Sequence, residues 1–195
     1  MYSQNDEEKY ILGHFAGVTG RFYDIGAADG KLLSNTYALL KQGWRGVEVE
    51  PDPINFIYMR KGLSDFQDQV DMVNAAVSTT KGLTPFWDSG GNLVSTISEN
   101  HYHACRPQFP HMENLTYYIN PVTPAELFDT FGPAEFISLD VEGNNLAVFR
   151  ELPFAWPELS MICVELEEPD KMVALAAEHG FRELHRTSEN LLLAR

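Results

Sequence analysis

The sequence is poor in positive charge and in cysteine. It carries 14 Lys and Arg residues against 28 Asp and Glu residues, which gives a formal net charge of −14. A surface this acidic repels phosphate groups, so we expect neither nucleic acid nor an anionic membrane as a partner. The only two cysteines, Cys105 and Cys163, lie far apart in the chain. They do not make a disulfide framework, and we expect free thiols.

Long apolar runs are also missing. No run approaches the roughly 18 residues that a membrane-spanning helix needs, so we expect no membrane insertion. The first eight residues are polar and acidic and lack the basic and apolar regions of a secretion signal, which favours a cytoplasmic location. With 195 residues, 44% of them hydrophobic, the chain is long enough for one domain with a substantial core.

Short apolar runs alternate with helical segments along the chain, which is typical of a parallel sheet covered on both faces. We expect strands at residues 21–25, 45–50, 70–77, 134–140 and 160–165, and an antiparallel edge hairpin formed by 181–184 and 191–194. Helices are expected at about 34–42, 53–62, 123–132, 144–151 and 169–179. The pattern predicts an α/β fold with a mostly parallel seven-stranded sheet.

Residues 79–122 break this alternation. They are rich in glycine, proline, aromatic residues and histidine, among them Trp87, His101, Tyr102 and His103. A connection this long without regular elements is usually functional or disordered, and its aromatic content argues against disorder. We therefore expect one domain over residues 1–195, with 79–122 inserted as a lid or substrate wall.

The turn after the first strand reads Asp24-Ile25-Gly26-Ala27-Ala28-Asp29-Gly30. Its glycines allow a sharp turn and close approach to a ligand. A dinucleotide fingerprint would need glycines where Ala28 and Lys31 stand, which disfavours a nicotinamide-dependent oxidoreductase. The acidic residues would repel a pyrophosphate. They suit a ligand with a cationic centre and no phosphate, a description that S-adenosylmethionine meets.

Glu50 ends the second strand, 24 residues after Gly26. This is close to the spacing at which an acid binds the ribose hydroxyls of a nucleoside in folds of this class. Strand, glycine turn, helix, strand and acid together indicate a nucleoside site.

Several segments resemble the FkbM-type methyltransferases: Tyr2-Ser3-Gln4-Asn5-Asp6-Glu7, the glycine turn, Ser34-Asn35-Thr36, Gly43-Trp44-Arg45-Gly46-Val47, Val49-Glu50-Pro51, Asn74-Ala75-Ala76-Val77 and Ser138-Leu139-Asp140-Val141-Glu142-Gly143. The resemblance spans nearly the whole chain, but within residues 79–122 it covers little beyond Ser95-Thr96. It implies a class I, Rossmann-like three-layer sandwich. It also implies methyl transfer from S-adenosylmethionine, with S-adenosylhomocysteine as product, usually to a hydroxyl oxygen of a sugar, glycan or other small molecule.

The same resemblance implies a set of cofactor-binding residues. Gly26, Ala27 and Gly30 would hold the methionine part, Glu50 the ribose, and Asn74 and Ala75 would border the adenine. Asp24 would anchor the turn or meet the ammonium group through water. Asn35 and Asp140 complete the set.

Asp140 and Glu142 lie on one side of the strand that ends at this segment, so both are expected to reach the ligand edge of the sheet. In-line methyl transfer depends mainly on alignment, and a hydroxyl acceptor also gains from a base. We expect Asp140 or Glu142 to be that base, with His101 of the insertion as a further candidate. A divalent metal held by these acids and a histidine is a separate possibility. Glu165, at the end of the fifth strand, could face the acceptor pocket, but we interpret it as part of a solvated acidic face.

An alternative from another class is a binding module that keeps the S-adenosylmethionine pocket but catalyses nothing. The sequence decides neither the acceptor nor the oligomeric state.

Overall fold

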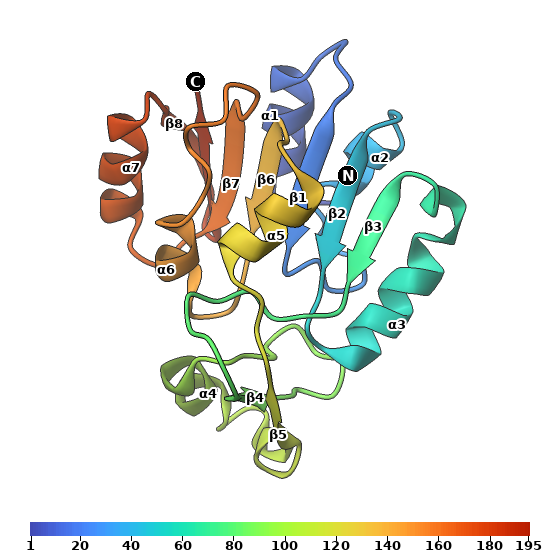
Figure 1. Cartoon of the computed structure of the whole chain (residues 1–195), viewed down its shortest axis with the longest axis vertical. Coiled ribbons are helices and arrows are strands. Elements are labelled where there is room, and N and C mark those ends of the chain that lie inside the picture. The colour runs from blue at the N-terminus through green and yellow to red at the C-terminus, as the bar shows by residue number, and fades with distance from the viewer.

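The computed structural model describes residues 1–195 and has at its centre a seven-stranded sheet of order β3-β2-β1-β6-β7-β9-β8 (Figure 1). The strands are β1 (Arg21–Ile25), β2 (Arg45–Val49), β3 (Val70–Val73), β6 (Phe136–Leu139), β7 (Met161–Glu165), β8 (Arg182–Arg186) and β9 (Asn190–Ala194). The first five run parallel, and β9 lies antiparallel between β7 and β8. The predicted sheet with its antiparallel edge hairpin is confirmed.

Helices cover both faces of this sheet. On one face lie α1 (Glu7–His14), α2 (Tyr37–Leu40) and α3 (Pro53–Gly62), and on the other α5 (Pro124–Phe131), α6 (Asn145–Phe149) and α7 (Pro169–Glu178). Each face has its own buried apolar cluster, as the alternation of strand side chains requires. Phe22 packs into the cluster beneath α1 to α3, and its neighbour Tyr23 into the cluster beneath α5 to α7. The structure contains no helix with both the length and the apolarity to cross a membrane.

Two helices begin where the sequence predicts. The Asp52 carboxylate accepts hydrogen bonds from the amides of Ile54 and Asn55, which caps α3. At α5, Thr123 and Glu126 form a reciprocal capping box. Both caps satisfy first-turn N–H groups that have no partner within the helix.

Several predicted bounds were wrong. β3 ends at Val73 and not at residue 77, because its neighbour β2 ends at Val49 and Pro51 has no N–H with which to extend the pairing. The predicted helix 34–42 is reduced to α2, since the Ser34 hydroxyl accepts from the amides of Thr36 and Tyr37 and holds residues 34–36 in a turn before the helix. β6 and α6 are also shorter than predicted, and α1 and α4 were not anticipated.

The insertion, residues 79–122, has regular structure of its own. β4 (Thr84–Trp87) pairs antiparallel with β5 (Thr116–Ile119), and α4 (Glu99–Cys105) and a 3-10 turn (Pro110–Asn114) lie between them. The rings of Trp87 and Tyr102 stack at 4.9 Å. Figure 1 shows the insertion beyond the end of the sheet toward which β2 and β3 point. It therefore lies at the edge where parallel sheets bind ligands.

The turn after β1 generates a prediction about stability. Gly26 has a φ of 93°, and a Cβ at this position would lie 1.7 Å from the Asp140 carbonyl oxygen. Gly26→Ala should therefore lower the free energy of unfolding by more than about 2 kcal/mol, measured by urea denaturation. Gly13→Ala, in α1 with open space around it, is the matched control and should stabilise the chain by roughly 0.5–1 kcal/mol. Equal effects of the two substitutions would contradict the prediction.

Candidate functional site

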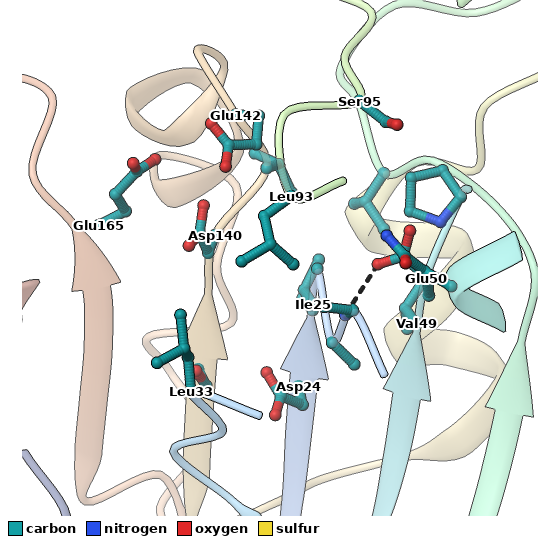
Figure 2. Close-up of a pocket in the computed structure, with 18 of the residues that line it drawn as sticks. Asp24, Ile25, Leu33, Val49, Glu50, Leu93, Ser95, Asp140, Glu142 and Glu165 are labelled. Carbon is teal, nitrogen blue, oxygen red and sulfur yellow. Dashed lines mark hydrogen bonds between the residues drawn. The ribbon is translucent and has the colours of Figure 1, made fainter. Parts of the chain in front are cut away.

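A cavity opens at the carboxyl ends of β1, β2, β6 and β7. β1 and β6 are neighbours in the sheet although the chain visits β2 and β3 between them. Strand order therefore reverses at this point, which is where open α/β sheets bind ligands. Figure 2 shows side chains from these strands and from the insertion converging on the cavity.

The glycine turn forms the floor of the cavity beside β2. The amides of Gly26 and Ala27 both donate to the Val49 carbonyl, at 2.8 and 3.0 Å. The chain then reverses through Ala28, at a φ of 49°, and the Ala28 amide donates to Glu50 Oε2 at 2.8 Å. The turn is thus tied to the end of β2, and its backbone borders the cavity.

Glu50 is buried, and both of its carboxylate oxygens contact backbone amides. Oε2 accepts from Ala28, and Oε1 accepts from the Asp52 amide at 2.7 Å. Burial raises the pKa of Glu50 to about 8, against the lowering effect of these hydrogen bonds. Each oxygen has a further lone pair, so the carboxylate can still accept from a ligand's hydroxyl groups.

A second acid network lies beneath the turn, on the α2 side of the sheet. Asp24 Oδ2 accepts from the Thr36 hydroxyl at 2.6 Å, and burial raises the pKa of Asp24 to about 6. Glu48 pairs with Asp24 in the strand register and is completely buried, with no partner for its Oε2. Burial, and after it the charge of Asp24, holds the pKa of Glu48 well above its usual value.

Three carboxylates, two from the turn after β6 and one from the end of β7, meet at the other end of the cavity (Figure 2). Asp140, Glu142 and Glu165 each offer an oxygen within 4.8 Å of the others, and we call them the acid cluster. Burial, and then mutual repulsion, raises the pKa of Glu142 to about 8 and that of Asp140 well above its usual range. Asp140 Oδ1 is buried without a hydrogen-bond partner. Carboxylate oxygens are also the ligands that Mg²⁺ and Mn²⁺ prefer. The binding of a divalent metal by these acids remains a prediction.

The backbone after β6 aims Glu142 into the cavity. Glu142 has a φ of 50°, which non-glycine residues rarely adopt, and its carbonyl accepts from the Thr96 hydroxyl at 2.7 Å. Behind it, His101 Nε2 lies 3.1 Å from Glu142 Oε2. Burial lowers the pKa of His101. The histidine contacts the carboxylate from the insertion side and does not line the cavity.

The insertion forms the remaining wall. Phe86, Leu93 and Ile97 line the cavity. The Ser95 hydroxyl donates to Asp52 Oδ2 at 2.7 Å, while Asp52 Oδ1 caps α3. The wall is therefore attached to the N-terminus of α3 on one side and to Glu142 on the other.

Most of the predicted site residues border this one cavity: Asp24, Gly26, Ala27, Asn35, Glu50, Ala75, Asp140 and Glu142. Gly30, Asn74 and His101 do not. Gly30 faces Leu63 and Met59 instead. The Asn74 amide donates to the carbonyls of Glu50 and Pro51, so it holds the loop that carries Glu50.

Sequence reasoning missed part of the cavity. The interpretation of Glu165 as a solvated acid was wrong, because its side chain joins the acid cluster. The register between β6 and β7 places Glu165 beside Asp140. Both acids come at the end of a predicted parallel strand, and this shared position could have indicated that they lie close together. Gln4, Glu189 and Asn190 also line the cavity, although they come from the two ends of the chain. No local pattern in the sequence indicates Glu189 or Asn190, and Gln4 lies in the segment of residues 2–7, which the family resemblance includes without giving it a role.

A family model described as the methyltransferase FkbM domain matches residues 24–183, from β1 to β8. The chain belongs to the FkbM methyltransferase family. The family implies S-adenosylmethionine as the cofactor. None of the curated proteins matches the chain.

Solved structures of other methyltransferases have the same fold. Methyltransferase FkbM from Methylobacillus flagellatus KT superposes with a TM-score of 0.55 at 13% identity, covering 91% of this chain and 44% of that one. A ribosomal protein L11 methylase from Lactobacillus delbrueckii subsp. bulgaricus gives 0.52 at 11% identity, covering 96% and 75%. A precorrin-6y C5,15-methyltransferase from Geobacter metallireducens GS-15 gives 0.50 at 14%, covering 96% and 86%. They confirm the class I methyltransferase fold, and their different names show that the fold does not select the acceptor.

The buried acid beneath the turn generates a pH-dependent prediction. Unfolded Glu48 ionises near pH 4.5, whereas its folded pKa is much higher. Stability present below the unfolded pKa is therefore lost as the pH rises toward the folded pKa. Glu48→Gln should raise the free energy of unfolding by at least about 1 kcal/mol at pH 8 and by much less at pH 5, measured by urea denaturation. An equal change at both values would contradict this account.

Proposed function

We propose that this chain transfers a methyl group from S-adenosylmethionine to a hydroxyl oxygen of a sugar, glycan or other small molecule. The observation that carries the proposal is the charge of the cavity. Six acids border it, and no Lys, Arg or His does: Asp24, Glu50, Asp140, Glu142, Glu165 and Glu189. A sulfonium cofactor with an ammonium group and no phosphate suits such a cavity electrostatically.

The residues present fit the cofactor. Glu50 has acceptor capacity left for the ribose hydroxyls, and Gly26 leaves room for close approach at the turn. Asp140 Oδ1 and Asn35 Oδ1 are buried acceptors without partners. An ammonium group would satisfy acceptors of this kind, which otherwise cost free energy.

When bound, S-adenosylmethionine supplies an electrophilic methyl group. The chain's part is to hold the acceptor in line with that group and to exclude water. The insertion supplies the apolar wall formed by Phe86, Leu93 and Ile97, and Glu142 borders the same cavity at the acid cluster. An anionic acceptor would be repelled by these carboxylates, which favours a neutral hydroxyl compound.

Glu142 is the group we propose as the base. It faces the cavity, whereas His101 contacts its carboxylate from behind. The ionised carboxylate takes the proton from the acceptor hydroxyl, and His101 acts as a positioning residue. A raised pKa makes Glu142 a stronger base than an ordinary carboxylate.

The cofactor assignment is tested by calorimetric titration with S-adenosylhomocysteine. We expect micromolar binding by the natural chain and at least tenfold weaker binding by Glu50→Ala, because the ribose hydroxyls lose their hydrogen-bond acceptor. Glu50→Gln keeps the shape of the side chain and one acceptor oxygen, so it should lose less affinity for S-adenosylhomocysteine than Glu50→Ala. Glu151→Ala, an exposed acid outside the cavity, should bind as the natural chain does. No binding by a folded natural chain would refute the cofactor assignment.

The base assignment predicts a pH profile. Turnover should rise with pH through about 8, because Glu142 acts only when it is ionised. Glu142→Gln should cut kcat by about 100-fold or more, remove this rise and leave S-adenosylhomocysteine affinity unchanged. Unchanged turnover would reject the assignment.

Turnover is also expected to survive dialysis against EDTA, and a loss that Mg²⁺ or Mn²⁺ restores would assign the acid cluster to a metal.

A binding module without catalysis is the second candidate function. Its support is the insertion, which the family resemblance covers least. Tight S-adenosylhomocysteine binding without turnover on a broad panel of sugars and other hydroxyl compounds would favour it. Family membership argues against the nicotinamide alternative, and quenching of tryptophan fluorescence by NADH but not by S-adenosylhomocysteine would revive it.

A further inference from the structure

The acidic cavity leaves one part of the proposed cofactor without an obvious partner. The methionine part carries a carboxylate as well as an ammonium group, and the cavity offers that carboxylate no basic side chain. It must be met by neutral hydrogen-bond donors. This step rests on the proposed function.

Among side chains, each amide offers two N–H donors, and all but one of the side-chain amides on the cavity wall already donate within the protein. The Nδ2 atoms of Asn35, Asn55, Asn92 and Asn190 donate to Ser138, the Asn92 carbonyl, the Ser89 carbonyl and Glu7, respectively. The fifth amide that lines the cavity belongs to Gln4. Its side chain is exposed and has no hydrogen bond to the chain, so both N–H groups remain for a ligand.

The backbone around Gln4 is firmly held. Ser3 forms a parallel bridge with Leu33, and the Ser3 hydroxyl accepts from the Glu8 amide at 3.1 Å. On the other side, the Asn5 amide donates to Glu7 Oε2 at 2.7 Å. Gln4 is therefore presented to the cavity from between two anchored neighbours.

Glu7 connects this segment to the far end of the chain. It is completely buried, and its Oε1 accepts from Thr187 Oγ1 and Asn190 Nδ2, both at 3.0 Å. Asn190 begins β9 and lines the cavity itself. The N-terminal segment is thus a fixed part of the cavity wall.

Gln4 lies toward the end of the cavity where the methionine part is expected. In Figure 2, Leu33 and Glu50 lie on opposite sides of Asp24. Glu50 is the proposed ribose partner, and the bridge between Ser3 and Leu33 brings Gln4 to the opposite side. A nucleoside held by Glu50 and extending past Asp24 has its amino-acid end there.

We propose that Gln4 binds the carboxylate of the methionine part of S-adenosylmethionine through its side-chain amide. The residue is then a determinant of cofactor specificity. It distinguishes ligands that carry the amino-acid end from those that end at the thioether. α1, through Glu7, holds this donor in place.

Two ligands separate this role from a general structural one. S-adenosylhomocysteine carries the carboxylate, and 5′-methylthioadenosine lacks the whole amino-acid part. In calorimetric titrations, Gln4→Ala should weaken S-adenosylhomocysteine binding about tenfold, the effect of one hydrogen bond to a charged group, and leave 5′-methylthioadenosine binding unchanged. Gln4→Glu should weaken S-adenosylhomocysteine binding further, because two carboxylates then face each other. Gln42→Ala removes an exposed glutamine outside the cavity and should bind both ligands as the natural chain does.

The outcomes separate the two proposals. If the natural chain binds neither ligand, the cofactor assignment fails and this inference fails with it. If the natural chain binds S-adenosylhomocysteine and Gln4→Ala binds it equally well, only the role of Gln4 is overturned. Equal weakening of both ligands, or unchanged cofactor affinity with a raised KM for the acceptor, also overturns it. Equal weakening of both ligands would assign Gln4 a structural role, whereas a raised KM for the acceptor alone would assign it to acceptor binding.

Discussion

Burial of like charges at one edge of the sheet is the constraint on which the rest of the structure depends. Carboxylates such as Asp24, Glu48 and Asp140 lie where water is excluded and no basic group compensates them, and their pKa values rise accordingly. Such groups cost stability at neutral pH. The two apolar clusters on either face of the sheet offset that cost by burying large side chains. Under the proposed function, a cationic ligand would offset part of that cost by pairing with these acids.

Polar contacts hold the insertion and the N-terminal segment in place around these acids. The insertion is attached through Ser95 to Asp52 and through Thr96 to the backbone of Glu142. The N-terminal segment is attached through Glu7 to the last hairpin. Each contact joins residues far apart in sequence. Part of the cavity wall therefore comes from segments distant from β1 and its glycine turn.

Local patterns in the sequence were sufficient for much of the fold and for one half of the site. Alternating apolar runs gave the strands, and caps such as Asp52 gave the helix starts, because both depend on neighbours within a few residues. The turn at Gly26 and the acid Glu50 were likewise found from spacing. Glu165 was misjudged because its partner Asp140 lies on a neighbouring strand, and strand neighbours are not written in local sequence.

The sequence by itself determined the class of fold, the glycine turn and the acidic character of the ligand site. These follow from residue type, period and spacing. Only the tertiary structure decided which acids share one cavity, that His101 contacts Glu142 from behind, and that Gln4 lines the cavity wall. Such contacts depend on strand order and on the packing of chain ends, which bring together residues separated by most of the chain.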